Sequence, residues 1–250
     1  MKKTISNIFM TAALLMAGMV VVSCEKENTP VSGTFTMTID ASKANLGGAK
    51  ALALVDGTTL NATWDANDEV AVYVGENRLG TLKPIQTGNY NTTLSGKISG
   101  TISGEDELIL KFCENPNYAS QDGTLDYIAD NCDYAEATVS VKAVEGDAII
   151  IDGSAVFENQ QAIVKFNLKN NAATPEPINA KPLVVSVGSN SYTVNPESPN
   201  SELFVAIPGF NGNVTLTATV GSDTYTKTKE GVTLENGKYY EINVNMTKVE

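Results

Sequence analysis

The chain has 250 residues, of which 42% are hydrophobic and 18% charged, against about 25% charged in an average protein. This composition excludes a disordered chain, and the length suits one large or two small domains. The absence of histidine excludes Ser-His-Asp and Cys-His catalysis and any His-ligated metal site. The net charge of −12 and the single arginine, Arg78, argue against nucleic-acid binding, because the chain repels phosphates and lacks paired guanidinium groups.

The N-terminus has the sequence pattern of an export signal. Lys2 and Lys3 precede a 15-residue apolar run from Ile8 to Val22, which suits a signal peptide and falls short of the ~20 residues that span a bilayer as a helix. The run ends in VVSC (residues 21–24), which resembles a bacterial lipobox. The resemblance implies that residues 1–23 are a lipoprotein signal peptide and that Cys24 becomes the lipidated N-terminus. The alternative is an ordinary signal peptide that contains a cysteine.

Lipidation of Cys24 would make the lipid the membrane anchor of the chain. Each buried CH₂ of an acyl chain contributes about 0.8 kcal/mol, and two chains already anchor a protein stably. No later stretch of the sequence is long and apolar enough to span a membrane. Removal of Lys2 and Lys3 would change the net charge from −12 to −14.

After a polar tether at residues 24–32, the sequence is a series of short runs in which apolar and polar residues alternate. The apolar residues of the first and last runs are Phe35, Met37 and Ile39, then Tyr240, Ile242, Val244 and Met246. A period of two with many β-branched residues is typical of half-buried antiparallel strands, and no sustained helical pattern occurs. The sequence predicts an all-β protein built from sandwiches or partial barrels.

We place a domain boundary at Asp152, next to Gly153 and Ser154. Residues 33–152 are then an N-terminal β-sandwich domain and residues 153–250 a C-terminal one. Each part is long enough for one sandwich.

Acidic residues cluster at several points without the spacing of a known site. Residues 64–69 (WDANDE) lack the pattern of a calcium loop, and we interpret them as an Asx-type turn between two strands. Pairs such as Asp122 with Asp126, or Asp147 with Asp152, would support glycoside hydrolysis only with a measured separation. With 29 acids in the chain, such pairs arise by chance. The sequence therefore predicts no enzyme, no cofactor and no metal site.

The segment at residues 113–137 holds two further candidate features. Cys113 and Cys132 are a candidate disulfide in an oxidising compartment, worth roughly 3 kcal/mol, and two unpaired thiols are the alternative. Tyr118, Tyr127 and Tyr134 lie among amide and hydroxyl side chains. They are candidates for binding a host or bacterial surface glycan, or they simply pack one ring face and hydrate the hydroxyl.

Four features in this order resemble one family. They are the lipobox and residues 64–73 (WDANDEVAVY), 121–127 (QDGTLDY) and 234–244 (LENGKYYEINV). Together they resemble the fimbrillin-type (type V pilin-type) outer-membrane lipoproteins of Gram-negative anaerobes. The resemblance implies two transthyretin-like antiparallel β-sandwich domains in tandem, a lipid anchor in the outer membrane with the protein exposed at the surface, and a fimbrial subunit in cell adhesion.

The resemblance also implies strand addition between subunits, and here the sequence departs from the family. In stalk subunits a protease, typically cutting after Arg, removes the first strand and the lipid, and a neighbour's strand fills the gap. This sequence has no Arg between Cys24 and Trp64, and its final predicted strand ends close to Glu250. We therefore expect a subunit that stays lipidated, as an anchor or accessory subunit. The alternative is a surface glycan- or ligand-binding lipoprotein that uses the 113–137 loop.

Overall fold

The computed structural model describes residues 29–43, 53–55 and 59–250, and Cys24 and the signal peptide lie outside them. The first half contains β1 (Val31–Lys43), β2 (Ala53–Val55), β3 (Thr59–Asn61), β4 (Val70–Val74), β5 (Asn77–Pro84), β6 (Asn91–Ile102), β7 (Glu107–Phe112), β8 (Ser120–Gln121), α1 (Leu125–Asn131), β9 (Ala135–Glu145), β10 (Ala148–Asp152) and β11 (Ala155–Asn159). The second half contains β12 (Gln161–Asn170), β13 (Leu183–Val187), β14 (Asn190–Val194), β15 (Glu202–Pro208), β16 (Phe210–Val220), β17 (Asp223–Leu234) and β18 (Tyr239–Lys248). The predicted all-β class is confirmed.

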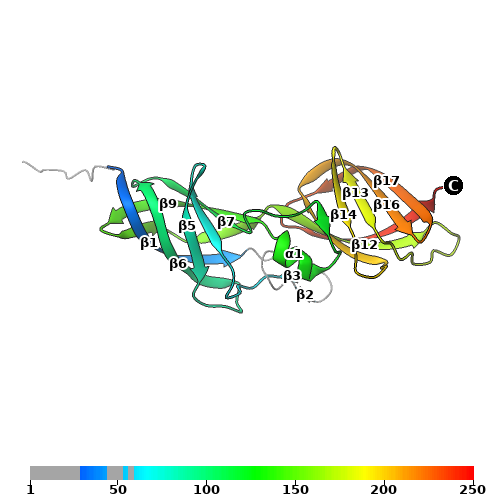
Figure 1. Ribbon diagram of the computed structural model, residues 1–250, viewed down its shortest axis with the longest axis horizontal. Helices are drawn as coiled ribbons and strands as arrows, with labels where there is room; N and C mark the ends of the chain where they lie inside the picture. The colour runs from blue at the N-terminus through cyan, green and yellow to red at the C-terminus, as the bar shows by residue number, and fades with distance from the viewer. Residues whose placement is uncertain (1–28, 44–52, 56–58) are drawn as a thin grey trace, which may run out of the picture.

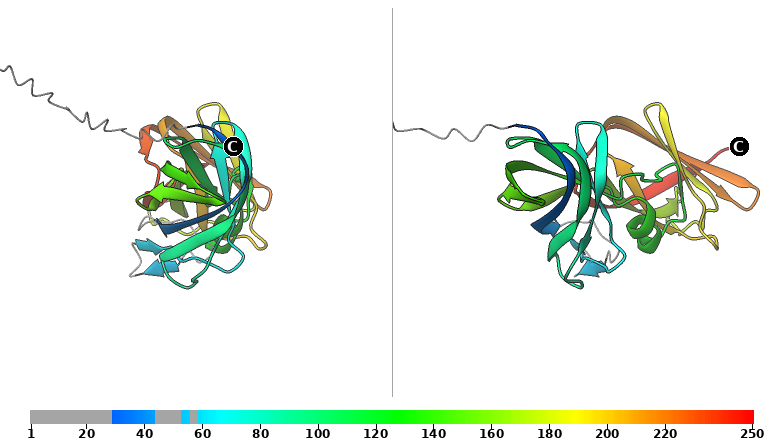
Figure 2. Two further views of the ribbon diagram at one scale, coloured as in Figure 1. Left: turned by 90° about the vertical axis from the view of Figure 1, so that its left-hand side faces the viewer. Right: turned by 60° about the vertical axis from the view of Figure 1, so that its left-hand side comes forward.

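Two β-sheets form two lobes along the long axis of the molecule (Figures 1 and 2). The first sheet has the order β10-β1-β11-β9-β7-β4-β5-β6, and β1 also pairs with β6, so this sheet closes on itself. Most ladders are antiparallel, as predicted. The exceptions include β1, which pairs in parallel with β10 and β11, and β12, which pairs in parallel with β18.

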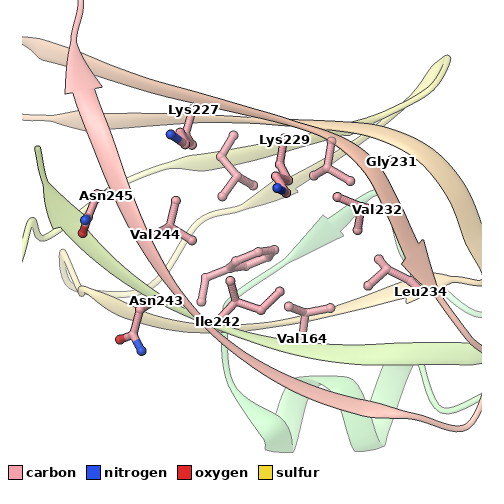
Figure 3. Close-up of a pocket in the computed structure, with 13 residues that line it drawn as sticks. Val164, Lys227, Lys229, Gly231, Val232, Leu234, Ile242, Asn243, Val244 and Asn245 are labelled. Carbon is pink, nitrogen blue, oxygen red and sulfur yellow. The ribbon is translucent and has the colours of Figure 1, made fainter.

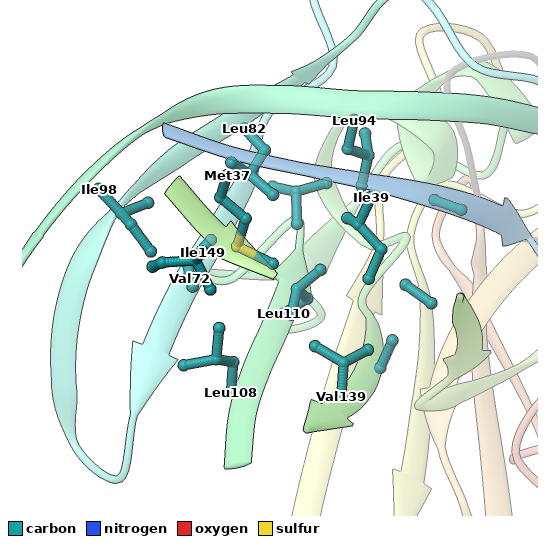
Figure 4. Close-up of a cluster of buried hydrophobic side chains, with 14 of the residues drawn as sticks. Met37, Ile39, Val72, Leu82, Leu94, Ile98, Leu108, Leu110, Val139 and Ile149 are labelled. Carbon is teal, nitrogen blue, oxygen red and sulfur yellow. The ribbon is translucent and has the colours of Figure 1, made fainter. Parts of the chain in front are cut away.

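The alternating pattern of β1 fills the core of the first sheet. Phe35, Met37 and Ile39 are each at most 3% exposed, and β1 pairs with β6 from Val31 to Ser42. Figure 4 shows Met37 and Ile39 among aliphatic side chains that converge from the surrounding strands. Burial of this apolar face stabilises the lobe, because about 25 cal/mol is gained per Å² of apolar surface removed from water. The face that the alternation predicted is confirmed.

A glutamine side chain completes the second sheet, whose order is β15-β12-β18-β17-β16-β13-β14-β8. The short strand β8, from the first half of the chain, pairs with β14 at one edge of this sheet. Gln121 of β8 is 2% exposed. Its Nε2 donates to the backbone oxygen of Ala206 on β15, and its Oε1 accepts from the Ala206 backbone N–H, both at 2.9 Å. The amide thus links β8 to the opposite edge strand as a peptide group would.

The helix α1 was not predicted from the sequence. Thr124 caps it by accepting a hydrogen bond from the backbone N–H of Tyr127 at 3.1 Å. Its buried residues Ile128 and Ala129 pack with Cys132 of the following loop against Ile163 and Ala206 of the second sheet. Seven residues are too few to show a helical period, so tertiary packing and the cap stabilise this helix.

The change from the first sheet to the second comes later than the predicted boundary at Asp152. Strand β11, residues Ala155–Asn159, pairs with β1 and β9 of the first sheet. Strand β12 begins at Gln161 and belongs to the second sheet. The turn at Asp152-Gly153 joins two strands of the same sheet, because both β10 and β11 lie beside β1.

Candidate functional site

The second sheet has an open seam between β17 and β18. Within the described residues the two strands pair only at Tyr225–Lys248 and Thr226–Thr247. Beyond this point β17 pairs with β16 on its other side, and β18 pairs with β12 from Tyr239 to Met246. The facing edges of β17 and β18 therefore present a row of backbone donors and acceptors outside any ladder. Such an edge is a template for pairing with another strand.

A groove with a volume of about 560 Å³ lies along the seam. We define the β17–β18 groove by its lining residues, which are Val164, Phe166, Val214, Leu216, Lys227, Lys229, Gly231, Val232, Leu234, Ile242, Asn243, Val244 and Asn245. Figure 3 shows the aliphatic side chains of this set gathered between β17 and β18. The floor belongs to the hydrophobic core of the second sheet, so the core reaches solvent along this seam.

Two lysines occupy core-facing positions along the groove. In the β16–β17 ladder Lys227 lies opposite Leu216, and Lys229 lies opposite Val214. Directly opposed residues share one face of a sheet, and both Leu216 and Val214 are buried. The two lysines are nevertheless exposed, because the seam opens beside them, and Figure 3 places both along the β17 side of the groove.

The groove combines an apolar floor, two unpaired edges and two cations. An extended peptide laid between β17 and β18 would hydrogen-bond both edges and place alternate side chains on the floor. Acidic side chains in that peptide would complement Lys227 and Lys229 in a chain whose net charge is −12. Inward-pointing charges on an edge strand also oppose unwanted strand pairing, which favours acidic partners over purely apolar ones.

The groove was missed in the sequence, although one signal was present. Tyr225, Lys227 and Lys229 are alternate residues of β17 and therefore lie on the same face of the strand. The two lysines thus occupy positions on the face that is otherwise apolar and directed to the core. A register shift in the β16–β17 ladder at Gly212/Val214 then brings Val232 and Leu234 onto the same face. Lysines in the buried phase of a strand are unusual enough to mark a functional or protected edge.

The structure shows Cys113 and Cys132 as thiols, with no disulfide among the described residues. Cys132 is fully buried, and its Sγ donates to the backbone oxygen of Asn117 at 3.1 Å. Burial, with smaller effects from the charges of Cys113 and Asp133, raises the pKa of the Cys132 thiol to about 12. Because the thiolate is the reactive form, this thiol is unreactive where it lies. The disulfide stays a prediction.

The three candidate glycan-binding tyrosines make hydrogen bonds within the chain. Tyr118 donates to Gln161 Oε1 at 3.2 Å, and Tyr127 donates to the backbone oxygen of Ser120 at 2.6 Å. Tyr134 donates to Glu136. Tyr127, which belongs to α1, and Tyr118 both pack against the buried cluster around Ile128, whereas Tyr134 lies outside that cluster. The residue 113–137 segment thus joins the two sheets, and its tyrosine hydroxyls already have partners.

The WDANDE segment forms the predicted Asx-type turn. The backbone N–H of Asn67 donates to Asp65 Oδ1 at 3.0 Å, and the N–H of Asp65 donates to Asp68 Oδ2 at 2.9 Å. Over the described part of the chain, no group of three or more Asp, Glu, Cys or His side chains is placed to hold a metal ion. Asp65 and Asp68 therefore organise the backbone of this turn, and Asp68 also forms an ion pair with Lys43 at 3.0 Å.

The membrane prediction at Cys24 lies outside the described residues. Within residues 29–43, 53–55 and 59–250, no helix is long and apolar enough to cross a membrane.

Comparison with known proteins gives matches at the level of structure. No family model matches the sequence, and no curated protein matches it. A "putative cell adhesion protein" from Bacteroides ovatus has 16% identity and a TM-score of 0.42, over 87% of this chain and 96% of that chain. A protein of the same description from Bacteroides uniformis has 11% identity and a TM-score of 0.46, over 86% and 97%. A fimbrial protein from Bacteroides ovatus has 9% identity and a TM-score of 0.36, over 87% of this chain and 50% of that chain.

Proposed function

We propose that this chain is a surface-anchored, fimbrillin-like lipoprotein that serves as an anchor or accessory subunit of an adhesive fimbria. The lipid on Cys24 holds it in the outer membrane, and the β17–β18 groove receives an extended strand of another subunit. The observation that carries the proposal is the pair of unpaired strand edges that face each other across an apolar groove. The adhesive and fimbrial role is the one that the names of the similar solved structures give to those proteins.

Strand addition suits this groove for a physical reason. Backbone N–H and C=O groups along β17 and β18 lose water when an apolar object covers them, and each unsatisfied group then costs about 1–3 kcal/mol. An extended peptide supplies partners for both edges, whereas an acyl chain supplies none. The apolar floor adds affinity through burial of alternate side chains, and Lys227 and Lys229 select acidic residues.

Charge reversal of the groove is expected to weaken strand addition. The Lys227→Glu/Lys229→Glu double variant should bind its partner subunit about tenfold less, because each contact at a partly exposed site contributes up to about 1 kcal/mol. The matched control is Lys97→Glu/Lys142→Glu, which makes the same charge change at exposed positions of the first sheet. The measurement is photo-cross-linking in the source cells from a photoreactive residue at position 232, with the partner peptide identified by mass spectrometry.

Each outcome of the cross-linking experiment bears on the proposal. An extended, acid-containing segment of another surface subunit, lost in the groove variant and kept in the control, supports strand addition. An equal loss in both variants would show that only overall charge matters. Self-association that increases in the groove variant would show that the lysines merely protect the edge. Either of the last two results overturns the assignment of the groove.

Removal of the lipidation site is expected to release the protein from the membrane. Cys24→Ala should move nearly all of the chain from the membrane fraction to the soluble fraction, because the acyl chains on Cys24 are the proposed anchor. Cys113→Ala is the control, since it removes a different cysteine, and it should leave the distribution unchanged. The measurement is fractionation of cells followed by immunoblotting. A Cys24→Ala variant that still sediments with membranes contradicts the lipid anchor.

A further inference from the structure

Lys43 and two aspartates are buried beside the first core. Lys43 and Asp68 are in contact, and both are close enough to Asp133 for their charges to affect its pKa. Lys43 ends β1 and is 4% exposed, Asp68 is 1% exposed, and Asp133 is fully buried. The Lys43 Nζ lies 3.0 Å from Asp68 Oδ2. It also lies over the rings of Trp64 and Phe112, at 3.9 and 4.2 Å from their centroids.

The two carboxyl groups are incompletely satisfied. Asp68 Oδ1 and Asp133 Oδ2 are buried oxygens with no hydrogen-bond partner in the described structure. Asp133 Oδ1 accepts from Asn159 Nδ2 at 3.0 Å and from Gln161 Nε2 at 3.1 Å. A buried ion pair is stable only when its remaining oxygens are satisfied, so an ion pair alone explains this arrangement poorly.

The surroundings of the cluster are those of a dry reaction site. Trp64 packs edge-on against Phe112 and Phe157, with centroids 5.9 and 5.6 Å apart, and this aromatic wall excludes water. The Lys43 amino group and the Asp68 carboxyl group are held in contact. In well-oriented intramolecular reactions, such proximity removes a large part of the activation barrier. Lys43 Nζ lies 3.0 Å from Asp68 Oδ2, and Oδ2 is bonded directly to Cγ. The distance from Nζ to Cγ is therefore longer than this by at most the length of one C–O bond.

We propose that Lys43 and Asp68 condense into an intramolecular isopeptide bond, with Asp133 moving the protons. The Nζ–Cγ bond forms, one Cγ–O bond of Asp68 breaks, and the oxygen leaves as water with two protons from the lysine ammonium group. No oxidant, reductant or further reactant is required. The neutral amide replaces a buried ammonium and a buried carboxylate, so the desolvation of both charges is relieved.

The electrostatics of the three groups support these roles. Burial lowers the pKa of Lys43, against the opposing effect of Asp68, and so favours the neutral amine that acts as a nucleophile. Burial raises the pKa of Asp133 to about 7, although Lys43 opposes the rise. A carboxyl group with a pKa near neutrality both accepts the ammonium proton and donates one to the leaving oxygen.

The bond would attach the first strand covalently to the rest of the lobe. Lys43 is the last residue of β1, and Asp68 lies in the turn before β4, separated from Val70 by Glu69. In the proposed anchored subunit, force on the N-terminal tether acts on β1 first. A cross-link at the far end of β1 would hold this strand when its hydrogen bonds to β6 break.

The test is peptide mapping of the mature protein isolated from membranes. After denaturation and trypsin digestion, the expected product is a branched peptide that joins the segments containing Lys43 and Asp68. Its mass is lower than the sum of the two segments by one water molecule, and cleavage after Lys43 is lost. The internal control is the pair Lys83 and Glu69, which are 2.9 Å apart but more than half exposed, and they should remain unlinked.

Three results decide the proposal. The branched peptide in the wild-type chain, absent in Lys43→Met and in Asp133→Asn, supports the bond and the role of Asp133. Linear peptides of full mass in the wild-type chain, with cleavage after Lys43, overturn the proposal without reference to any variant. A branched peptide that persists in Asp133→Asn overturns the assignment of proton transfer to Asp133.

Discussion

Met246→Asp is expected to unfold the second lobe, whereas Asn245→Asp should leave its stability within about 0.5 kcal/mol. Met246 on β18 is fully buried in the second core, and its neighbour Asn245 is exposed on the other face of the strand. A carboxylate at position 246 would lie in an apolar core with no cation beside it, which costs several kcal/mol. This is a large fraction of the 5–15 kcal/mol that stabilises a typical domain.

The measurement for this pair is urea unfolding followed by far-UV circular dichroism. Met246→Ala provides a milder variant, for which a loss of about 2–5 kcal/mol is expected from the cavity. A graded series from Asn245→Asp through Met246→Ala to Met246→Asp confirms the face of β18. Equal tolerance of the two aspartates would show that the strand is registered differently against β12.

The strand faces could be predicted from the sequence because they depend on local alternation. In β1 the apolar residues Phe35, Met37 and Ile39 alternate with threonines, and this alternation determines which face of the strand is buried. A shift of one residue in the register would turn every side chain to the opposite face. The same holds for Val244 and Met246 at the end of the chain. Tyr240 and Ile242 lie on the predicted face of β18 but are only half-buried, and Ile242 lines the open seam.

Features that depend on contacts between distant segments could not be predicted in this way. The seam exists because β17 and β18 diverge after Thr226, and no local pattern reports the angle between two strands. The buried cluster joins Lys43, Asp68 and Asp133 from three separate segments, each of which looks like an ordinary turn or strand end. The chain passes from the first sheet to the second after Asn159, later than the predicted boundary at Asp152, because β11 returns to pair with β1.

In the tyrosine-rich segment, composition alone does not distinguish a sugar site from structural packing. Aromatic rings among amides suit both roles, and the structure shows that two of the amides make hydrogen bonds within the fold. Asn117 donates to the Tyr127 hydroxyl at 3.2 Å, and Gln121 links two edge strands. Polar side chains that connect lobes and those that bind ligands have the same composition, and only their hydrogen-bond partners distinguish them.

Asp133→Asn is expected to remove a pH dependence of stability between about pH 4 and pH 7. Burial raises the pKa of Asp133 from 3.8 to about 7, and Lys43 and the hydrogen bond from Asn159 oppose this rise. In the unfolded chain the carboxyl group loses its proton near its ordinary pKa, whereas in the folded chain it keeps the proton to about pH 7. Folding therefore takes up a proton in this window, so the stability of the wild-type protein falls as the pH rises through it and is constant above it. An isopeptide bond at Lys43 would remove the opposing positive charge and would leave this direction unchanged.

The size of the effect follows from the shift of the pKa. Each unit corresponds to about 1.4 kcal/mol, so the contribution of Asp133 is a few kcal/mol across the window. The measurement is the free energy of unfolding in urea at about pH 4.5 and about pH 8 for the wild type and the variant, with the exposed Asp152→Asn as control. Glu241, whose pKa is lowered by hydrogen bonds from Asn167 and Lys165, contributes the opposite slope to all three proteins and cancels in the difference. The variant should gain stability relative to the wild type as the pH rises, while the control should not. A wild-type-to-variant difference that stays constant across the window would show that Asp133 is ionised throughout.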